Sequence, residues 1–157
     1  MQLAINYEES PASNNGIGVW VQVAVSNMEF PDILDIDEFF QALKNSDHQV
    51  SPLFTCVCGS FGCGGYYLES EPQDKVWVWR NHYDPLEQQL IRKFQHAFSW
   101  EDIQRVAREL VGVLEELQHM HPGAEIFSGT YGLDLAPRIA QYRELVERGM
   151  PIRNSVE

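Results

Sequence analysis

The spacing of apolar residues changes along this chain, and that change limits the folds that it can adopt. In GVWVQVAVSN, residues 18–27, valines recur at every second position, which is the period of a half-buried strand. In residues 103–117 apolar side chains recur every three or four positions, which is the period of a helix. Because strand patterns fill the first half and helix patterns the second, the sequence predicts an α+β fold.

Five short runs have strand character. MQLAINYE and GVWVQVAVSN flank a turn-forming segment and predict a first antiparallel hairpin. SPLFTCVC, GGYYLES and KVWVWRN are separated by Gly-rich and Glu-Pro-Gln-Asp turns and predict an antiparallel meander. We therefore expect an antiparallel sheet of about five strands, with three to four helices packed mainly on one face.

Four segments combine a capping residue with an apolar stripe of helical period. They are residues 35–45, 84–97, 99–120 and 136–148. In the second segment, Asp84 is followed by Pro85 at the first helical position and by Glu87 three residues after the cap. In the third, Ser99 and Asp102 repeat this arrangement. Each segment is expected to be a helix.

Length and composition favour one ordinary domain, residues 1–157. An apolar content of 44% and an aromatic content of 11% exclude an intrinsically disordered chain. The short N-terminal apolar run has no basic residues before it and no long hydrophobic segment follows, so a cytoplasmic protein is expected. An odd number of cysteines in such a protein argues against disulfides and favours free thiols or metal ligands.

The formal charge of −12 is unevenly distributed, because residues 1–43 contain seven acidic residues and no Lys or Arg. This pattern opposes binding to nucleic acid or to an anionic membrane and favours a basic protein partner. The alternative is that the acidic surface only maintains solubility. The carboxylates expected to meet the partner are those in the segment that enters the first helix: Glu29, Asp32, Asp35, Asp37 and Glu38.

All three cysteines lie in TCVCGSFGCGGYY, residues 55–67. Cys56 and Cys58 share a face of a predicted strand, and the glycines allow Cys63 to return beside them. The interpretation that we favour is a packed hairpin in which cysteine is a small apolar residue and glycine supplies turns and a bulge. Redox chemistry is less favoured, because no Cys-x-x-Cys stands at a helix N-terminus. A zinc site is the other alternative, with a fourth ligand from His82, Asp84 or His48.

The string FTCVCGSFGCGGYYLE, followed by KVWVWRN, resembles small bacterial proteins with a Cys-x-Cys-Gly-x-x-Gly-Cys-x-Gly hairpin. Some of these are associated with the immunity proteins of polymorphic-toxin and contact-dependent inhibition systems. The resemblance covers about 30 residues and rests on this one motif. It implies a binding protein without catalysis, often acidic because nuclease toxins are basic.

The motifs of common enzyme classes do not occur in the sequence: there is no Gly-x-Ser-x-Gly, no Walker loop and no dinucleotide fingerprint. The leading hypothesis is therefore an acidic cytoplasmic binding protein, an immunity protein that neutralises a basic toxin, with no enzymatic activity and no cofactor. The alternative is a small zinc-binding or enzyme-associated domain built around Cys56, Cys58 and Cys63, with His82. The oligomeric state is left open by the sequence.

Overall fold

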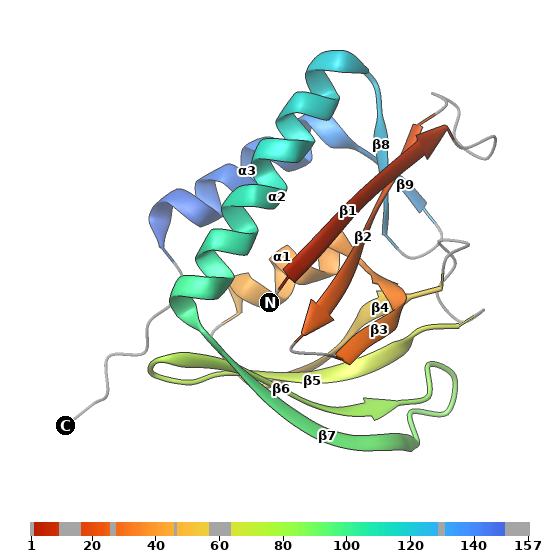
Figure 1. Ribbon diagram of the computed structural model, residues 1–157, viewed down its shortest axis with the longest axis vertical. Coiled ribbons are helices and arrows are strands. Elements are labelled where there is room, and N and C mark those ends of the chain that lie inside the picture. The colour runs from red at the N-terminus through yellow and green to blue at the C-terminus, as the bar shows by residue number, and fades with distance from the viewer. Residues whose placement is uncertain are drawn as a thin grey trace.

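A computed structural model describes residues 2–9, 17–25, 28–45, 47–56, 64–128 and 131–149, with side chains for 33–45, 47–56, 64–126 and 133–149. Over these ranges the chain forms nine strands and three helices (Figure 1). In chain order they are β1 (Gln2–Glu9), β2 (Ile17–Val25), β3 (Met28–Leu34), α1 (Ile36–Lys44), β4 (Gln49–Thr55), β5 (Tyr66–Pro72), β6 (Val76–Tyr83), β7 (Leu90–Ser99), α2 (Trp100–Met120), β8 (Glu125–Ser128), β9 (Tyr131–Asp134) and α3 (Leu135–Arg148).

The strands form one sheet in the order β7-β6-β5-β4-β3-β2-β8-β9, and β1 pairs with β2. Paired strands are antiparallel except β2 and β8, which are parallel. β1 occupies one edge of β2, so β8 and β3 share the other edge, β8 beside its first half and β3 beside its second. The sheet is strongly curled, and Figure 1 shows β5, β6 and β7 crossing beneath β1 and β2.

The α+β class predicted from the sequence is confirmed. The five predicted strand runs correspond to β1, β2, β4, β5 and β6, with the expected antiparallel pairing. The sheet also contains β3, β7, β8 and β9. The helices do not clearly share one face of it: α1 contacts β4 and β8, whereas α2 and α3 pack side by side (Figure 1).

Each of the three helices begins at a capping side chain that accepts a hydrogen bond from a backbone N–H of the first turn. Asp35 caps α1 through the N–H of Glu38, at 3.0 Å. Ser99 caps α2 through the N–H of Asp102, at 3.1 Å, as the sequence predicts. Asp134 caps α3, which ends before a glycine with a φ of 79°.

The helix predicted for residues 84–97 is wrong, because most of this segment is strand β7. The start signal does form a turn: Asp84 Oδ1 accepts hydrogen bonds from two backbone N–H groups that follow it, both at 2.8 Å. Gln88 then takes a φ of 52°, and the chain returns along β6 as a hairpin. Pairing with β6 buries Phe98 against Trp79, so tertiary contacts outweigh the local helix preference.

Aromatic rings form much of the core. Trp77 and Trp79 on β6 are fully buried and meet edge to face, with ring centroids 5.1 Å apart. Phe98 on β7 lies 4.8 Å from Trp79, and Phe39 on α1 lies 5.7 Å from Trp77. Burial of this kind fixes α1 against the sheet, and with it the carboxylates of its first turn.

Candidate functional site

The carboxylates that the sequence marks for partner binding differ in exposure. Asp35 and Asp37 are buried, with 3% and 8% of their surface exposed, and Glu38 is half-buried. Glu29 and Asp32 belong to β3, and their side chains lie outside the described part of the structure. We expected several of these carboxylates to project together toward a partner, and the burial of Asp35 and Asp37 shows that these two do not.

Asp37 joins two helices that are far apart in the sequence. Its Oδ1 accepts hydrogen bonds from the Tyr142 hydroxyl at 2.6 Å and from Arg138 Nη1 at 3.1 Å, so the carboxylate of α1 anchors α3. Burial, together with the hydrogen bond to Asp37, raises the pKa of Tyr142 above its ordinary value. No local pattern predicts this contact, because its partners are separated by 101 and 105 residues.

Glu38 has a perturbed acidity. Burial, followed by repulsion from Asp35 and Asp37, raises the pKa of Glu38 from 4.5 to about 7. Near neutral pH this side chain therefore exchanges between a carboxylate and a neutral acid. The first turn of α1 thus connects α1 to α3 through Asp37, and it also contains Glu38, whose pKa lies near physiological pH.

The described part of the cysteine hairpin is closely packed. Gly65 has a φ of +82°, and a Cβ built on it would lie 2.3 Å from the carbonyl oxygen of Phe54. A Cβ on Gly64 would lie 2.9 Å from Cys56 Cβ. The chain therefore returns so near to β4 that only glycine fits at these two positions, as the packed-hairpin interpretation requires.

Cys56 follows β4 directly and is disulfide-bonded. The expectation of a free thiol or a metal ligand is therefore wrong at this position. Cys58 and Cys63 lie outside the described residues. Because a disulfide uses two of the three cysteines in the chain, the alternative of a zinc site that needs Cys56, Cys58 and Cys63 together is wrong.

The proposed non-cysteine ligands have other roles in the structure. His82 is buried between Tyr66, which stacks on it at 4.0 Å, and Phe94, which meets it edge-on at 4.3 Å. Burial, assisted by the charge of Arg92, lowers the pKa of His82 to about 4. Asp84 caps the β6–β7 turn. Across the described ranges, no group of three or more His, Cys, Asp and Glu side chains is placed to hold a metal ion.

His48, the remaining candidate ligand, lies at the surface. Its Nε2 is 3.7 Å from Glu69 Oε2, on the neighbouring strand β5. Half of the His48 side chain is exposed, so this contact is a surface interaction.

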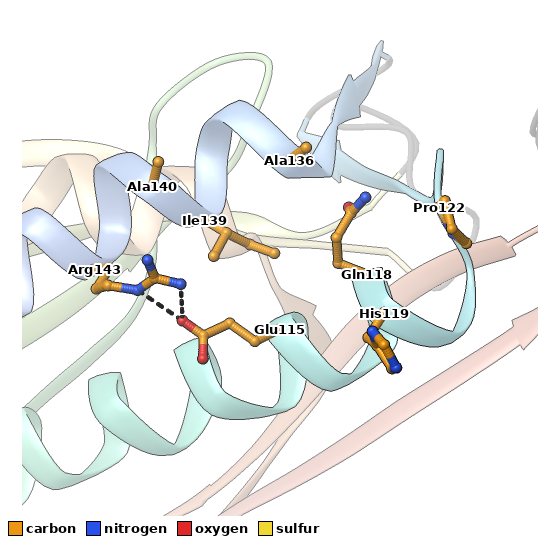
Figure 2. Close-up of a pocket in the computed structure, with 8 residues that line it drawn as sticks. All are labelled: Glu115, Gln118, His119, Pro122, Ala136, Ile139, Ala140 and Arg143. Carbon is orange, nitrogen blue, oxygen red and sulfur yellow. Dashed lines mark hydrogen bonds and ion pairs between the residues drawn. The ribbon is translucent and has the colours of Figure 1, made fainter.

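A groove separates α2 from α3 near the end of α2 (Figure 2). Its volume is about 560 Å³, within the range of about 300 to 1,000 Å³ that ligand sites occupy. Its lining consists of Glu115, Gln118, His119, Pro122, Ala136, Ile139, Ala140 and Arg143. The short side chains of Ala136 and Ala140, one turn apart on α3, leave the space open. This pair of alanines is the sequence signal by which the groove could have been found.

An ion pair crosses the groove at one end. Both Nε and Nη2 of Arg143 donate to the same oxygen of Glu115, Oε1, at 2.9 and 2.6 Å (Figure 2). The second carboxylate oxygen of Glu115 takes no part in this pair. A second hollow adjoins the first and is lined by Glu115, Glu116, His119 and the exposed side chain of Met120. Together the two hollows form a surface with apolar and acidic groups side by side.

Two further carboxylates lie on the strands that follow α2 and precede α3. Glu125 on β8 and Asp134 on β9 are cross-strand partners, and Asp134 caps α3 immediately before Ala136. Among the described residues neither forms an ion pair with a basic side chain. Glu116 lines the hollow that adjoins the groove, and the N–H of Ala136, which lines the groove, donates a hydrogen bond to Asp134.

No family model matches the sequence, and no curated protein or solved structure is significantly similar to it. None of the helices in the described ranges has the length and apolar character needed to cross a membrane.

Proposed function

We propose that this chain is a binding protein without catalytic activity, and that it is an immunity protein that neutralises a basic toxin by occupying its surface. The resemblance of the cysteine hairpin to such proteins and the net charge of −12 support this assignment. Acidic inhibitors associate rapidly with basic partners because their opposite fields steer the encounter.

The observation that carries the proposal is the pairing of charges within the chain. Many of the arginines already have carboxylate partners: Arg80, Arg105, Arg138, Arg143 and Arg148. Among the described residues, exposed carboxylates without an ion-pair partner include Asp74, Glu87, Glu101, Glu116, Asp134 and Glu147. Internal pairing neutralises many of the cations and leaves a surplus of negative charge facing solvent.

The α2–α3 groove is the surface that suits such a partner best. A Lys or Arg of the partner would meet Glu116 or the open oxygen of Glu115, and an apolar neighbour would contact Met120 and Ile139. Asp35 and Asp37 are buried and take no part, while Glu29 and Asp32 remain candidates for the same partner. Nucleic acids and anionic membranes are not expected as partners, because their phosphates would be repelled.

The test begins with capture of the partner from the source cell and continues with binding kinetics at two salt concentrations. A Glu116→Lys, Glu125→Lys variant should associate at least about tenfold more slowly than the wild type, and added salt should weaken the wild-type complex. The matched control is Asp74→Lys, Glu87→Lys, which makes the same change of charge in the β5–β6 and β6–β7 turns. Its association should fall less.

Two results would contradict the proposal. One is a specific partner whose binding responds neither to salt nor to the groove substitutions. The other is turnover of a substrate by the isolated chain, since a stoichiometric inhibitor performs no reaction.

A further inference from the structure

One polar atom in the α2–α3 groove has no hydrogen-bond partner. Gln118 Oε1 is enclosed, and no donor among the described residues reaches it. Figure 2 shows the Gln118 amide extending from α2 toward Ala136 on α3, between the two helices. An enclosed acceptor without a donor is unfavourable, and native proteins contain few of them. A ligand that brings an N–H group to this place would therefore relieve an unfavourable feature of the free protein.

A second acceptor lies one helical turn away. Glu115 and Gln118 are three positions apart on α2, so they share one side of that helix. Arg143 donates only to Oε1 of Glu115, which leaves Oε2 for another donor. A ligand that enters the groove thus meets a neutral amide oxygen and a carboxylate oxygen.

The charges around the groove favour a cation. Glu115 and Glu116 carry two negative charges, and Arg143 neutralises one of them by pairing with Glu115. Glu116 is exposed and has no ion-pair partner in the described ranges, so its charge is not balanced. This charge attracts a cation and repels an anion.

Arginine is the cationic side chain that fits these features best. Its planar guanidinium has five N–H donors, so one group can donate to two acceptors at once. The guanidinium is also weakly hydrated, whereas the ammonium of lysine is strongly hydrated and loses more on entering an enclosed place. Ile139, Ala136 and Ala140 offer apolar surface to the methylene stem of the arginine.

We propose that the α2–α3 groove receives an arginine side chain of the partner protein, whose guanidinium donates to Gln118 Oε1 and Glu115 Oε2. Rotation about the last torsion of Gln118, which is broad for an amide, turns its oxygen toward the donor. The segment that carries the arginine covers Met120, which is 54% exposed in the adjoining hollow. This role for arginine rests on the function proposed above, because it presupposes a basic partner.

The experiment uses the full chain and three capped tetrapeptides, acetyl-Gly-X-Gly-Leu-amide, in which X is arginine, lysine or citrulline. Citrulline has the shape of arginine without its charge. Binding is followed by NMR through the methyl groups of Ile139 and Met120, with those of Val50 on β4 as a reference outside the groove. We expect the arginine peptide to shift the Ile139 and Met120 signals. It should bind at least about fivefold more tightly than the lysine peptide and at least about tenfold more tightly than the citrulline peptide.

Three variants locate the site. Gln118→Glu puts a carboxylate oxygen in place of the amide oxygen and should strengthen binding of the arginine peptide by at least about threefold. Gln118→Leu removes the acceptor and should weaken binding by at least about fivefold. Gln89→Glu makes the same change of charge in the exposed β6–β7 turn and should change binding by less than about 1.5-fold. Circular dichroism of all three variants shows whether the fold is retained.

Four results would overturn the proposal: no binding of the arginine peptide, equal binding of the lysine or citrulline peptide, equal effects of Gln118→Glu and Gln89→Glu, or shifts confined to methyl groups outside the groove. None of the four contradicts the function proposed above, which is judged by the captured partner and its response to salt. Conversely, if the arginine peptide binds as expected while the partner ignores both salt and the groove charges, the groove is an arginine site and the proposed function is wrong.

Discussion

Asp37 accepts hydrogen bonds from Arg138 and Tyr142 through one oxygen; Asp37 and Tyr142 are buried, and the Arg138 side chain is 28% exposed. A carboxylate buried in this way loses hydration, and its hydrogen-bond donors compensate for that loss. For Glu38, the next residue, burial and repulsion from Asp35 and Asp37 raise the pKa. Two adjacent acidic residues in the first turn of α1 therefore differ: Asp37 binds α3, and Glu38 has a raised pKa.

Replacing Asp37 by alanine should lower the free energy of unfolding by about 2 to 4 kcal/mol, because Arg138 and the Tyr142 hydroxyl would lose their acceptor. Tyr142→Phe, which removes one donor and keeps the ring, should cost about 1 kcal/mol. Urea unfolding followed by fluorescence measures both. Glu101→Ala, at an exposed position, is the control. If Asp37→Ala lowers the free energy of unfolding no more than this control does, the contact between α1 and α3 through Asp37 does not stabilise the fold.

The raised pKa of Glu38 predicts how stability depends on pH. The folded protein binds this proton up to a pH of about 7 and the unfolded chain only up to 4.5, so this contribution to stability is complete below 4.5 and is lost as pH rises to 7. Glu38→Gln should therefore gain stability relative to the wild type across that window. The free energy of unfolding of each protein is measured as a function of pH, and the difference between the two proteins reports the contribution of Glu38 alone. A constant difference from pH 4 to 8 would contradict the assignment.

At the scale of elements, the sequence predicts a structure well wherever local signals and burial agree. The capping residue and the apolar stripe of α2 predicted where this helix begins and ends. The alternation of valines predicted strand β2. In residues 84–97 the local signals and burial disagree. Asp84 and Pro85 favour a helix, whereas pairing with β6 brings Phe98 into the aromatic core. Distant pairing of this kind has no local signature. The contact of Asp37 with α3 was missed for the same reason.

The stripe of α2 gives a prediction for one element. Leu110 and Leu114 are fully buried, so replacing either by alanine should cost about 2 to 5 kcal/mol. Arg108 is exposed on the same helix, and Arg108→Ala should cost less than about 1 kcal/mol. Thermal and urea unfolding provide the comparison. Equal losses of unfolding free energy at the three positions would mean that Leu110 and Leu114 do not face the core.

For the molecule as a whole, the acidic surplus opposes folding, because compaction brings like charges together. Composition alone predicts this surplus. It does not predict that the exposed Glu116 lies beside the α2–α3 groove, since that placement depends on how α2 packs against α3. The α+β class thus follows from the sequence, and the surfaces follow from the topology.

Raising sodium chloride from 10 to 300 mM should stabilise the protein by about 1 kcal/mol, or about 2 to 4 °C in Tm, because the screening length falls below the spacing of many surface charges. The variant Glu116→Gln, Glu125→Gln removes two negative charges and should respond less. Differential scanning calorimetry gives both values. A Tm that falls with salt would mean that attractive ion pairs dominate over the surplus charge.

The parallel pairing of β2 with β8 sets an order of events during synthesis. Gly18 pairs with Glu125 and Val19 with Ile126, so one edge of β2 stays partly open until residue 126 has left the ribosome. At about 5 to 20 residues per second, the intervening hundred or so residues take roughly 5 to 20 seconds to make. For that interval the nascent chain carries an unfinished sheet, and we expect chaperones that hold emerging chains to bind it until the last strands arrive.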